Sequence, residues 1–242
     1  MKKLLSILCV TFLLAIFTAC GNSTSAEAIS TEAAGAASSQ NMQSASSGKT
    51  RANTSHENDT AQSTQAEEEN KMLVVYFSLA GEQYNVGVVE EGNTSIIAHM
   101  IAEQTGADLF EIEATTPYPT SHSELLDVSR QEMTSHARPE IAGTVDNMDD
   151  YDTIFIGYPI WWADMPMIVY NFLESYDLSG KTIVPFCTHG GSGLSNTEST
   201  IANITGGTMK DGLAIPGTTA QNDRETARSE VTKWLKEGGF VE

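Results

Sequence analysis

Cysteine is scarce in this chain of 242 residues, which contains only Cys9, Cys20 and Cys187. Cys9 lies in an apolar N-terminal segment that is predicted to be removed, and Cys20 lies at the end of that segment. Cys187 is then the one thiol left in the folded part, so no disulfide framework is possible there. We expect Cys187 to be buried and inert rather than a nucleophile, because no basic residue lies near it in sequence.

Basic residues are also few, with 13 Lys and Arg against 32 Asp and Glu and a formal net charge of −19. Residues 71–242 alone hold 9 basic and 25 acidic residues, a formal balance of −16. No basic stripe is present, so the sequence argues against nucleic acid as a partner. The acidic surface either favours docking to a basic or membrane-bound redox partner or only keeps the protein soluble.

One long apolar run is present, at residues 4–17, and it is too short to span a bilayer as a helix. Lys2 and Lys3 precede it, and Phe17-Thr18-Ala19-Cys20 follows and resembles a bacterial lipobox. We therefore expect a signal peptide over residues 1–20 and a lipid on Cys20. The protein would then be extracytoplasmic and held at a bacterial membrane by the lipid anchor only. The alternative is an ordinary secretory signal in which Cys20 is incidental.

Aromatic residues are absent from residues 21–70, which are rich in Ser, Ala, Thr and Glu. Such a composition cannot bury enough apolar area to offset chain entropy, so this segment is predicted to be a disordered tether. Residues 71–242 have the length of one domain.

Within that domain, strand-like and helix-like runs alternate. Strands are expected at residues 71–77, 108–114, 151–158, 182–187 and 208–215, with helices between them and a last helix over 222–237. Asp164 is expected to cap the helix after the third strand. This order predicts an α/β fold with a doubly wound, open parallel sheet of five strands and helices on both faces. Ligands bind such sheets beyond the carboxyl ends of the strands, so three loops should meet there: the first loop (78–94), the second loop (158–166) and the third loop (188–194).

The first loop has the composition of a phosphate site. Ser78, Gly92, Asn93 and Thr94 lie between an apolar strand and a helix, where hydroxyls, the side-chain amide and free backbone N–H groups can donate to an anion. No Lys or Arg lies in this loop, which distinguishes it from a nucleoside-triphosphate loop. Residues 81–91 interrupt it and form either a flap that places Tyr84 against a ligand or a passive hairpin outside the site.

The other two loops suggest a site for a flat ring. The second loop contains Pro159, Ile160, Trp161 and Trp162, and an aromatic side chain there can lie against a heterocycle; for Trp162, packing on a neighbouring helix is the alternative. Glycines of the third loop let backbone N–H groups approach a ligand closely. That loop holds these residues: Thr188, His189, Gly190, Gly191 and Ser192.

His189 is the one histidine placed where chemistry could occur. It either donates a proton or hydrogen bond to a bound ligand, which makes it the candidate catalytic residue, or caps its own loop. The other histidines, among them His99 and His122, lack metal-ligand spacing, so no metal site is predicted.

Without residues 81–91, the first loop reads Y-F-S-L-A-G-N-T, which resembles the first loop of the flavodoxin family. The Y-P-I-W-W and T-H-G-G-S-G segments extend the resemblance over residues 71–240. It implies the strand order 2-1-3-4-5 and one non-covalent flavin mononucleotide (FMN). By carry-over, Ser78, Asn93 and Thr94 would hold the phosphate, and the second and third loops would border the ring. Ala80 departs from the family pattern where many relatives have a hydroxyl.

The third loop also lacks the tyrosine that covers the flavin in many electron carriers of this family, so one face of the ring would be open. This feature favours an FMN-dependent oxidoreductase of the NAD(P)H:quinone reductase type, acting on quinones or similar acceptors. Two alternatives stay open. One is an electron carrier that docks to a redox partner, and the other is a binding module that has lost its flavin.

Overall fold

The computed structural model describes residues 70–242. The predicted signal peptide, the lipidation site at Cys20 and the tether up to residue 69 lie outside the described residues. The helices are α1 (Asn93–Thr105), α2 (His122–Ser135), α3 (Met167–Ser175), α4 (Thr197–Thr205), α5 (Gly217–Asn222) and α6 (Arg224–Gly238), with a short 3-10 turn at Met148–Asp150. The strands are β1 (Met72–Tyr76), β2 (Gly81–Gln83), β3 (Gly87–Val89), β4 (Asp108–Glu111), β5 (Glu113–Ala114), β6 (Ile141–Ala142), β7 (Thr153–Pro159), β8 (Thr182–His189), β9 (Thr208–Met209) and β10 (Leu213–Pro216).

The main sheet is parallel and has the order β4-β1-β7-β8-β10, with β9 pairing with the start of β8. Because β9 and β10 both pair with β8, they are two parts of one edge strand. Numbered along the chain, the five strand positions follow the order 2-1-3-4-5, so the predicted fold class is confirmed.

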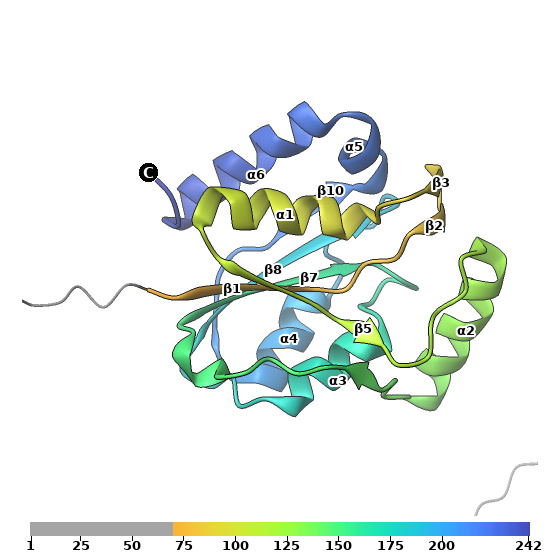
Figure 1. Ribbon diagram of the computed structural model, residues 1–242, viewed down its shortest axis with the longest axis horizontal. Coiled ribbons are helices and arrows are strands. Elements are labelled where there is room, and N and C mark those ends of the chain that lie inside the picture. The colour runs from red at the N-terminus through yellow and green to blue at the C-terminus, as the bar shows by residue number, and fades with distance from the viewer. Residues whose placement is uncertain (1–69) are drawn as a thin grey trace, which may run out of the picture. The chain divides into compact units, whose positions relative to one another are not determined.

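Helices cover both faces of this sheet. Figure 1 shows α1, α5 and α6 on one side of the strands and α3 and α4 on the other. Two apolar clusters fill the layers between them. Val74, Phe155 and Val184 are opposite one another in register and face α1 and α6, whereas Leu73, Ile154 and Ile183 form the neighbouring row and face α3 and α4. The continuous apolar runs predicted from the sequence follow from this double coverage.

Helix α1 begins directly at the end of the first loop and therefore positions that loop. Its apolar residues Ile97 and Ile101 are fully buried against the sheet, and Gly106 ends the helix in the left-handed conformation with a φ of 72°. Gly106 N–H donates to the Ala102 carbonyl at 2.8 Å, as expected for a glycine C-cap. The start of α1 is thereby fixed beside the carboxyl end of β1.

Residues 81–91 form a β-hairpin inserted in the first loop. Strands β2 and β3 pair antiparallel as a hairpin, with Gly81 opposite Val89. In Figure 1 this hairpin projects beyond the carboxyl ends of the strands, on the same side as α2 and α5. Within residues 70–242, no helix combines the length and apolar character needed to cross a membrane.

Candidate functional site

The three loops meet at the carboxyl edge of the sheet and enclose a cavity of about 430 Å³, here called the main cavity. A narrow pocket of about 20 Å³ adjoins it at the start of α1 and shares Asn93, Trp161 and Thr188 with it. Of the predicted binding residues, the main cavity is lined by Asn93, Pro159, Ile160, Trp161, Trp162, Thr188, His189, Gly190 and Ser192. Ser78 and Thr94 line the narrow pocket instead. Gly92 and Gly191 line neither space.

Gly92 closes the first loop. A Cβ at this position would lie 2.2 Å from Ser78 Oγ and 2.5 Å from the Leu79 carbonyl oxygen, so only glycine fits without a backbone shift. Gly92 is the N-cap residue of α1, and Ser95 N–H donates to Ser78 Oγ at 3.0 Å. The backbone N–H groups of Asn93 and Thr94 belong to the first turn of α1 and have no acceptor within the helix. The two ends of the loop therefore meet as the phosphate-site prediction requires.

Two buried hydroxyls join the first and third loops. Thr94 Oγ1 lies 2.8 Å from Thr188 Oγ1, and both residues are almost completely buried. One hydroxyl must donate to the other, which leaves a second hydroxyl proton free for another acceptor. Asn93 Oδ1 is buried and is the only such side-chain atom in residues 70–242 without a hydrogen-bond partner. An unpaired buried amide oxygen is costly, so this position is suited to a ligand that donates a hydrogen bond.

The second loop is built around a tight turn. Trp161 and Asp164 exchange two backbone hydrogen bonds of 2.8 and 2.9 Å, and the residues between them, Trp162 and Ala163, have φ values of 55° and 63°. Positive φ at both central positions normally requires Gly or Asn, so this turn is held by its surroundings. The sequence predicted Asp164 as the cap of α3, and this prediction is wrong, since Pro166 is the N-cap residue. The Asp164 carboxylate instead accepts from Met165 N–H and from the Tyr170 hydroxyl, and α3 begins at Met167.

The two tryptophans have different neighbours. Trp161 meets Phe77 and Tyr118 edge to face, with ring centroids 5.6 Å apart in each pair, and lines both the main cavity and the narrow pocket. Trp162 packs on α2: its Nε1 donates to Ser129 Oγ at 3.1 Å and the Arg130 guanidinium lies 3.8 Å from its ring centroid. The alternative of helix packing for Trp162 is thus realised, and its ring nevertheless borders the main cavity.

His189 is held in one tautomer by the third loop. Gly191 N–H donates to His189 Nδ1 at 2.9 Å, so the proton of the neutral ring lies on Nε2. Burial lowers the pKa of His189 below its ordinary value, which favours this neutral form. His189 therefore both caps its loop and offers an Nε2–H donor in a ring that borders the cavity. The N–H of Gly191 is already taken by His189 and is not free for a ligand in this geometry, so a ligand contact of Gly191 stays a prediction.

Helix α2 forms a wall of the main cavity that the sequence analysis missed. His122, Leu125, Leu126 and Ser129 line the cavity at the i, i+3, i+4, i+7 spacing of one helix face. The spacing of these four residues indicates one helix face, but it does not distinguish a face that lines a cavity from one that packs on a core. Gly217, the first residue of α5, is the other lining residue that had no place in the prediction.

The hairpin of residues 81–91 forms a further wall of the main cavity. It therefore lies where the flap interpretation places it, and not outside the site. Tyr84 lines the main cavity, and a Cβ on Gly190 would lie 2.7 Å from the Tyr84 ring. The close approach explains why the third loop needs glycine at this position. Tyr84 thus covers the backbone of the third loop from a segment that lies more than a hundred residues earlier in the chain.

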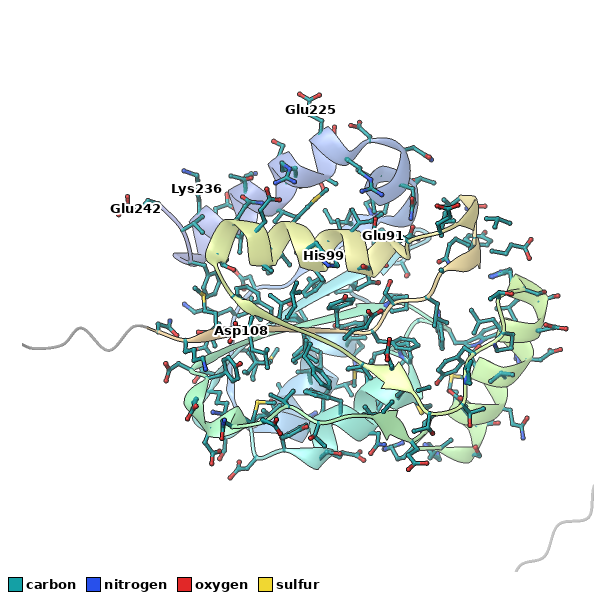
Figure 2. All side chains as sticks on the ribbon, in the orientation of Figure 1. Glu91, His99, Asp108, Glu225, Lys236 and Glu242 are labelled. Carbon is teal, nitrogen blue, oxygen red and sulfur yellow. The ribbon has the colours of Figure 1, made fainter. Side chains whose placement is uncertain are left out.

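Charge is sparse around the main cavity. Its lining contains the carboxylate of Glu82 and the two histidines, and no Lys or Arg. His99 on α1 and Glu91 just before α1, both labelled in Figure 2, interact with each other at 3.9 Å and do not line the cavity. Within residues 70–242, no group of three or more His, Cys, Asp and Glu side chains is arranged to hold a metal ion. Cys187 is fully buried, and burial raises its pKa to about 12, as expected of an inert thiol.

The protein has a parallel sheet of order 2-1-3-4-5 and a largely apolar cavity at the carboxyl edge of that sheet. One end of the cavity lies at a helix start whose lining contains no Lys or Arg. These features define a flavodoxin-like α/β protein. The chain belongs to the flavodoxin family: the sequence model of that family, described as Flavodoxin, matches residues 71–237. The predicted family is therefore confirmed. Membership also supports FMN as the cofactor that the sequence predicted.

The chain is also similar to several solved structures. A flavoprotein from Bacteroides eggerthii DSM 20697 is 30% identical with a TM-score of 0.54, and the match covers 70% of this chain and 98% of that one. A flavoprotein from Bacteroides uniformis ATCC 8492 is 32% identical with a TM-score of 0.55, covering 67% and 98%. A flavoprotein from Lactobacillus acidophilus NCFM, solved in complex with FMN, is 22% identical with a TM-score of 0.49, covering 68% and 98%. No curated protein matches the chain.

Proposed function

We propose that this domain binds FMN and acts as a flavin-dependent reductase of quinones or similar acceptors. The observation that carries the proposal is the shape and chemistry of the site. An apolar cavity of about 430 Å³ ends in a narrow pocket at the start of α1, where donors converge without a cation. Cavities of this size hold small-molecule ligands, and a helix start favours an anion.

The residues of the first loop would hold the phosphate. The N–H groups of Asn93 and Thr94, the hydroxyl proton of Ser78 and the free proton of the Thr94–Thr188 pair are the donors near the narrow pocket. Asn93 Oδ1 lacks a donor, and the ribityl hydroxyls of FMN are donors of the required kind. The chain's own residues thus fit the group that the family implies.

The second and third loops would border the ring. Pro159, Ile160 and Trp161 offer apolar contacts on one side, and Gly190 and Ser192 bring the backbone of the third loop close on another. When bound, FMN supplies the capacity to take up and release one or two electrons. Neutral His189 can donate a hydrogen bond from Nε2 to a ligand atom that gains negative charge, which is how fixed donors stabilise charge in a site.

The overall reaction would consume a reduced nicotinamide, a quinone and one proton, and would yield an oxidised nicotinamide and a hydroquinone. The test is to purify the protein, record its visible spectrum, and then add NADH or NADPH with menadione. A yellow preparation that bleaches with nicotinamide and regains its colour with menadione is the expected result. A coloured protein that neither nicotinamide reduces is not a nicotinamide-dependent reductase. A preparation that stays colourless after incubation with excess FMN is a binding module without flavin.

A second candidate is an electron carrier, and the acidic surface favours it. Acidic residues outnumber basic ones by far, and Glu225 and Glu242, labelled in Figure 2, lie at the periphery of the domain. Such a surface would attract a positively charged or membrane-bound redox partner. Electron transfer to a basic redox protein that slows steeply with added salt, combined with no nicotinamide oxidation, would establish the carrier instead.

We also propose that Cys20 carries a lipid that anchors the protein outside the cytoplasm. The support is the charged, apolar and small-residue pattern of residues 2–20. Cys20→Ser should move the protein from the membrane fraction to the soluble fraction, as an immunoblot of the two fractions would show. Retention of the Cys20→Ser protein in the membrane fraction would contradict lipid anchoring at this residue.

A further inference from the structure

Exposed apolar side chains gather at the mouth of the main cavity. Residues 70–242 contain five large hydrophobic side chains that are substantially exposed, and three of them, Tyr84, Leu126 and Trp162, line this cavity. A fourth, Val88, lies on the same hairpin as Tyr84. Single exposed apolar residues are ordinary, but a cluster of them at a cavity indicates a binding surface. Together with His122, the three lining residues are here called the mouth compartment.

The wall that carries Tyr84 is fixed rather than loose. The Glu82 backbone N–H donates to the Thr120 carbonyl at 2.8 Å, and the Glu82 carboxylate accepts from His122 N–H at 3.0 Å. That carboxylate lies at the first residue of α2, where the helix dipole favours a negative charge. The Tyr84 and His122 rings are 5.9 Å apart and inclined by 32°. The hairpin is therefore tied to α2 and presents its aromatic ring in a defined place.

The mouth compartment has little that would attract a charged ligand. Glu82, the one carboxylate of the cavity lining, would repel an anion. The Arg130 guanidinium, 3.8 Å from the Trp162 ring centroid, is engaged in a cation–π contact with that ring. Aromatic rings, by contrast, attract flat apolar molecules through stacking and edge contacts. The charge and the side chains of the compartment are thus complementary to a neutral, planar molecule.

We propose that the mouth compartment binds the electron acceptor, that this acceptor is an uncharged planar molecule such as a naphthoquinone without an ionised substituent, and that Tyr84 determines its affinity. The inference rests on the proposed FMN function, since the acceptor would bind next to the flavin. It assigns the interrupted first loop a specificity role that is separate from its phosphate contacts.

The experiment measures acceptor binding to the FMN-loaded protein by isothermal titration calorimetry, with protein and acceptor both oxidised so that no electrons pass. The neutral probe is menadione, and the charged probe is 1,4-naphthoquinone-2-sulfonate, which has the same ring system. The variants are Tyr84→Ala, Tyr84→Phe and, as a matched control on the same hairpin, Val88→Ala. FMN affinity of each variant is measured separately by titrating the flavin-free protein and following flavin fluorescence.

Menadione should bind the wild type more tightly than the sulfonate does. Tyr84→Ala should weaken menadione binding about two- to twelvefold, the equivalent of losing one aromatic contact, whereas Tyr84→Phe and Val88→Ala should stay within about twofold of the wild type. FMN affinity should stay within about twofold of the wild type in Tyr84→Phe and Val88→Ala, and in Tyr84→Ala it should fall by a clearly smaller factor than menadione affinity. These results would support the assignment.

Four outcomes would overturn it. Equal affinity for the two probes would refute selection against charge. Loss of FMN affinity in Tyr84→Ala, in parallel with menadione affinity, would make Tyr84 a flavin contact rather than an acceptor contact. Normal FMN uptake without any menadione binding would refute the acceptor site and leave FMN binding intact, whereas failure of the wild type to take up FMN would remove the proposed function and this inference together.

Discussion

The buried pair of hydroxyls between Thr94 and Thr188 offers the sharpest test of how the site is assembled. The pair joins the first turn of α1 to the end of β8 at 2.8 Å, and the two residues are 1% and 3% exposed. Valine has nearly the shape of threonine but lacks the hydroxyl. Thr94→Val or Thr188→Val alone therefore leaves one buried hydroxyl without its partner.

Such an unsatisfied group costs about 1–3 kcal/mol of unfolding free energy. For a domain of this size, each 1 kcal/mol corresponds to about 2–4 °C in Tm. Each single variant should consequently lose between about 2 and 12 °C. The double variant replaces both hydroxyls by methyl groups and leaves no orphan, so it should be more stable than the sum of the single effects predicts.

The assay is thermal unfolding for Tm and guanidinium unfolding for the free energy, both on the flavin-free protein and followed by circular dichroism, for the wild type and the three variants. A coupling free energy of about 0.5–3 kcal/mol is expected. Strictly additive single effects would show that the two hydroxyls do not depend on each other and would refute this reasoning. FMN affinity is a second readout: Thr94→Val and the double variant should both bind FMN at least about tenfold more weakly, because a hydrogen bond to a charged group is lost.

Three further predictions concern the ring, the histidine and the charge of the site. Trp161→Ala should weaken FMN binding by about two- to twelvefold while Trp161→Phe keeps most of the affinity, and unchanged affinity of the alanine variant in a fluorescence titration would exclude Trp161 from the flavin site. The pKa of His189 is lower in the folded protein than in the unfolded chain, so the unfolded chain binds the proton more readily. The contribution of neutral His189 to the unfolding free energy is therefore complete above about pH 6.5 and is lost as the pH falls. His189→Gln should then make the unfolding free energy less sensitive to acid between pH 7 and pH 5. Equal slopes of unfolding free energy against pH for the wild type and the variant would contradict this. FMN affinity should rise when salt increases from 10 to 150 mM, because screening weakens repulsion between the acidic protein and the phosphate, whereas a fall would indicate that cations hold the phosphate.

The strands could be predicted from the sequence because buried parallel strands are continuous apolar runs. Ile154-Phe155-Ile156 is fully buried on both sides, and its position in β7 follows from composition alone. The fifth strand was predicted as one segment but is divided into β9 and β10. Between them, Gly212 N–H donates to Glu198 Oε1, and the Asp211 carbonyl accepts from Trp234 Nε1. Side chains from elsewhere in the fold replace the strand pairing there, and no local pattern encodes that.

The site was predictable where chemistry and topology coincide and not where it depends on tertiary contacts. Loops at the carboxyl ends of parallel strands must converge, so the placement of Ser78, Trp161 and His189 around one region followed from strand order. The turn at Trp162 and Ala163 lacks the Gly or Asn that signals positive φ, so its geometry had no local signal. The cavity face of α2 was hidden because a helix face that lines a cavity has the same spacing as one that packs on a core.

The interrupted first loop separates two tasks that a single loop would otherwise combine. The hairpin leaves after Ala80 and returns before Gly92, and its ends meet so closely that Gly92 abuts Ser78 and Leu79. The residues suited to phosphate therefore keep their arrangement, as Ser95 N–H bonded to Ser78 Oγ shows. The inserted residues reach α2 and the third loop and line the mouth of the cavity. Side-chain hydrogen bonds tie the hairpin to the phosphate end at Gln83, whose Nε2 donates to the Leu79 carbonyl at 3.1 Å, and at Glu91, which accepts from Ser95 Oγ at 3.4 Å. Changes elsewhere in the hairpin, as at Tyr84 or Val88, can consequently alter what approaches the ring while the phosphate end stays the same.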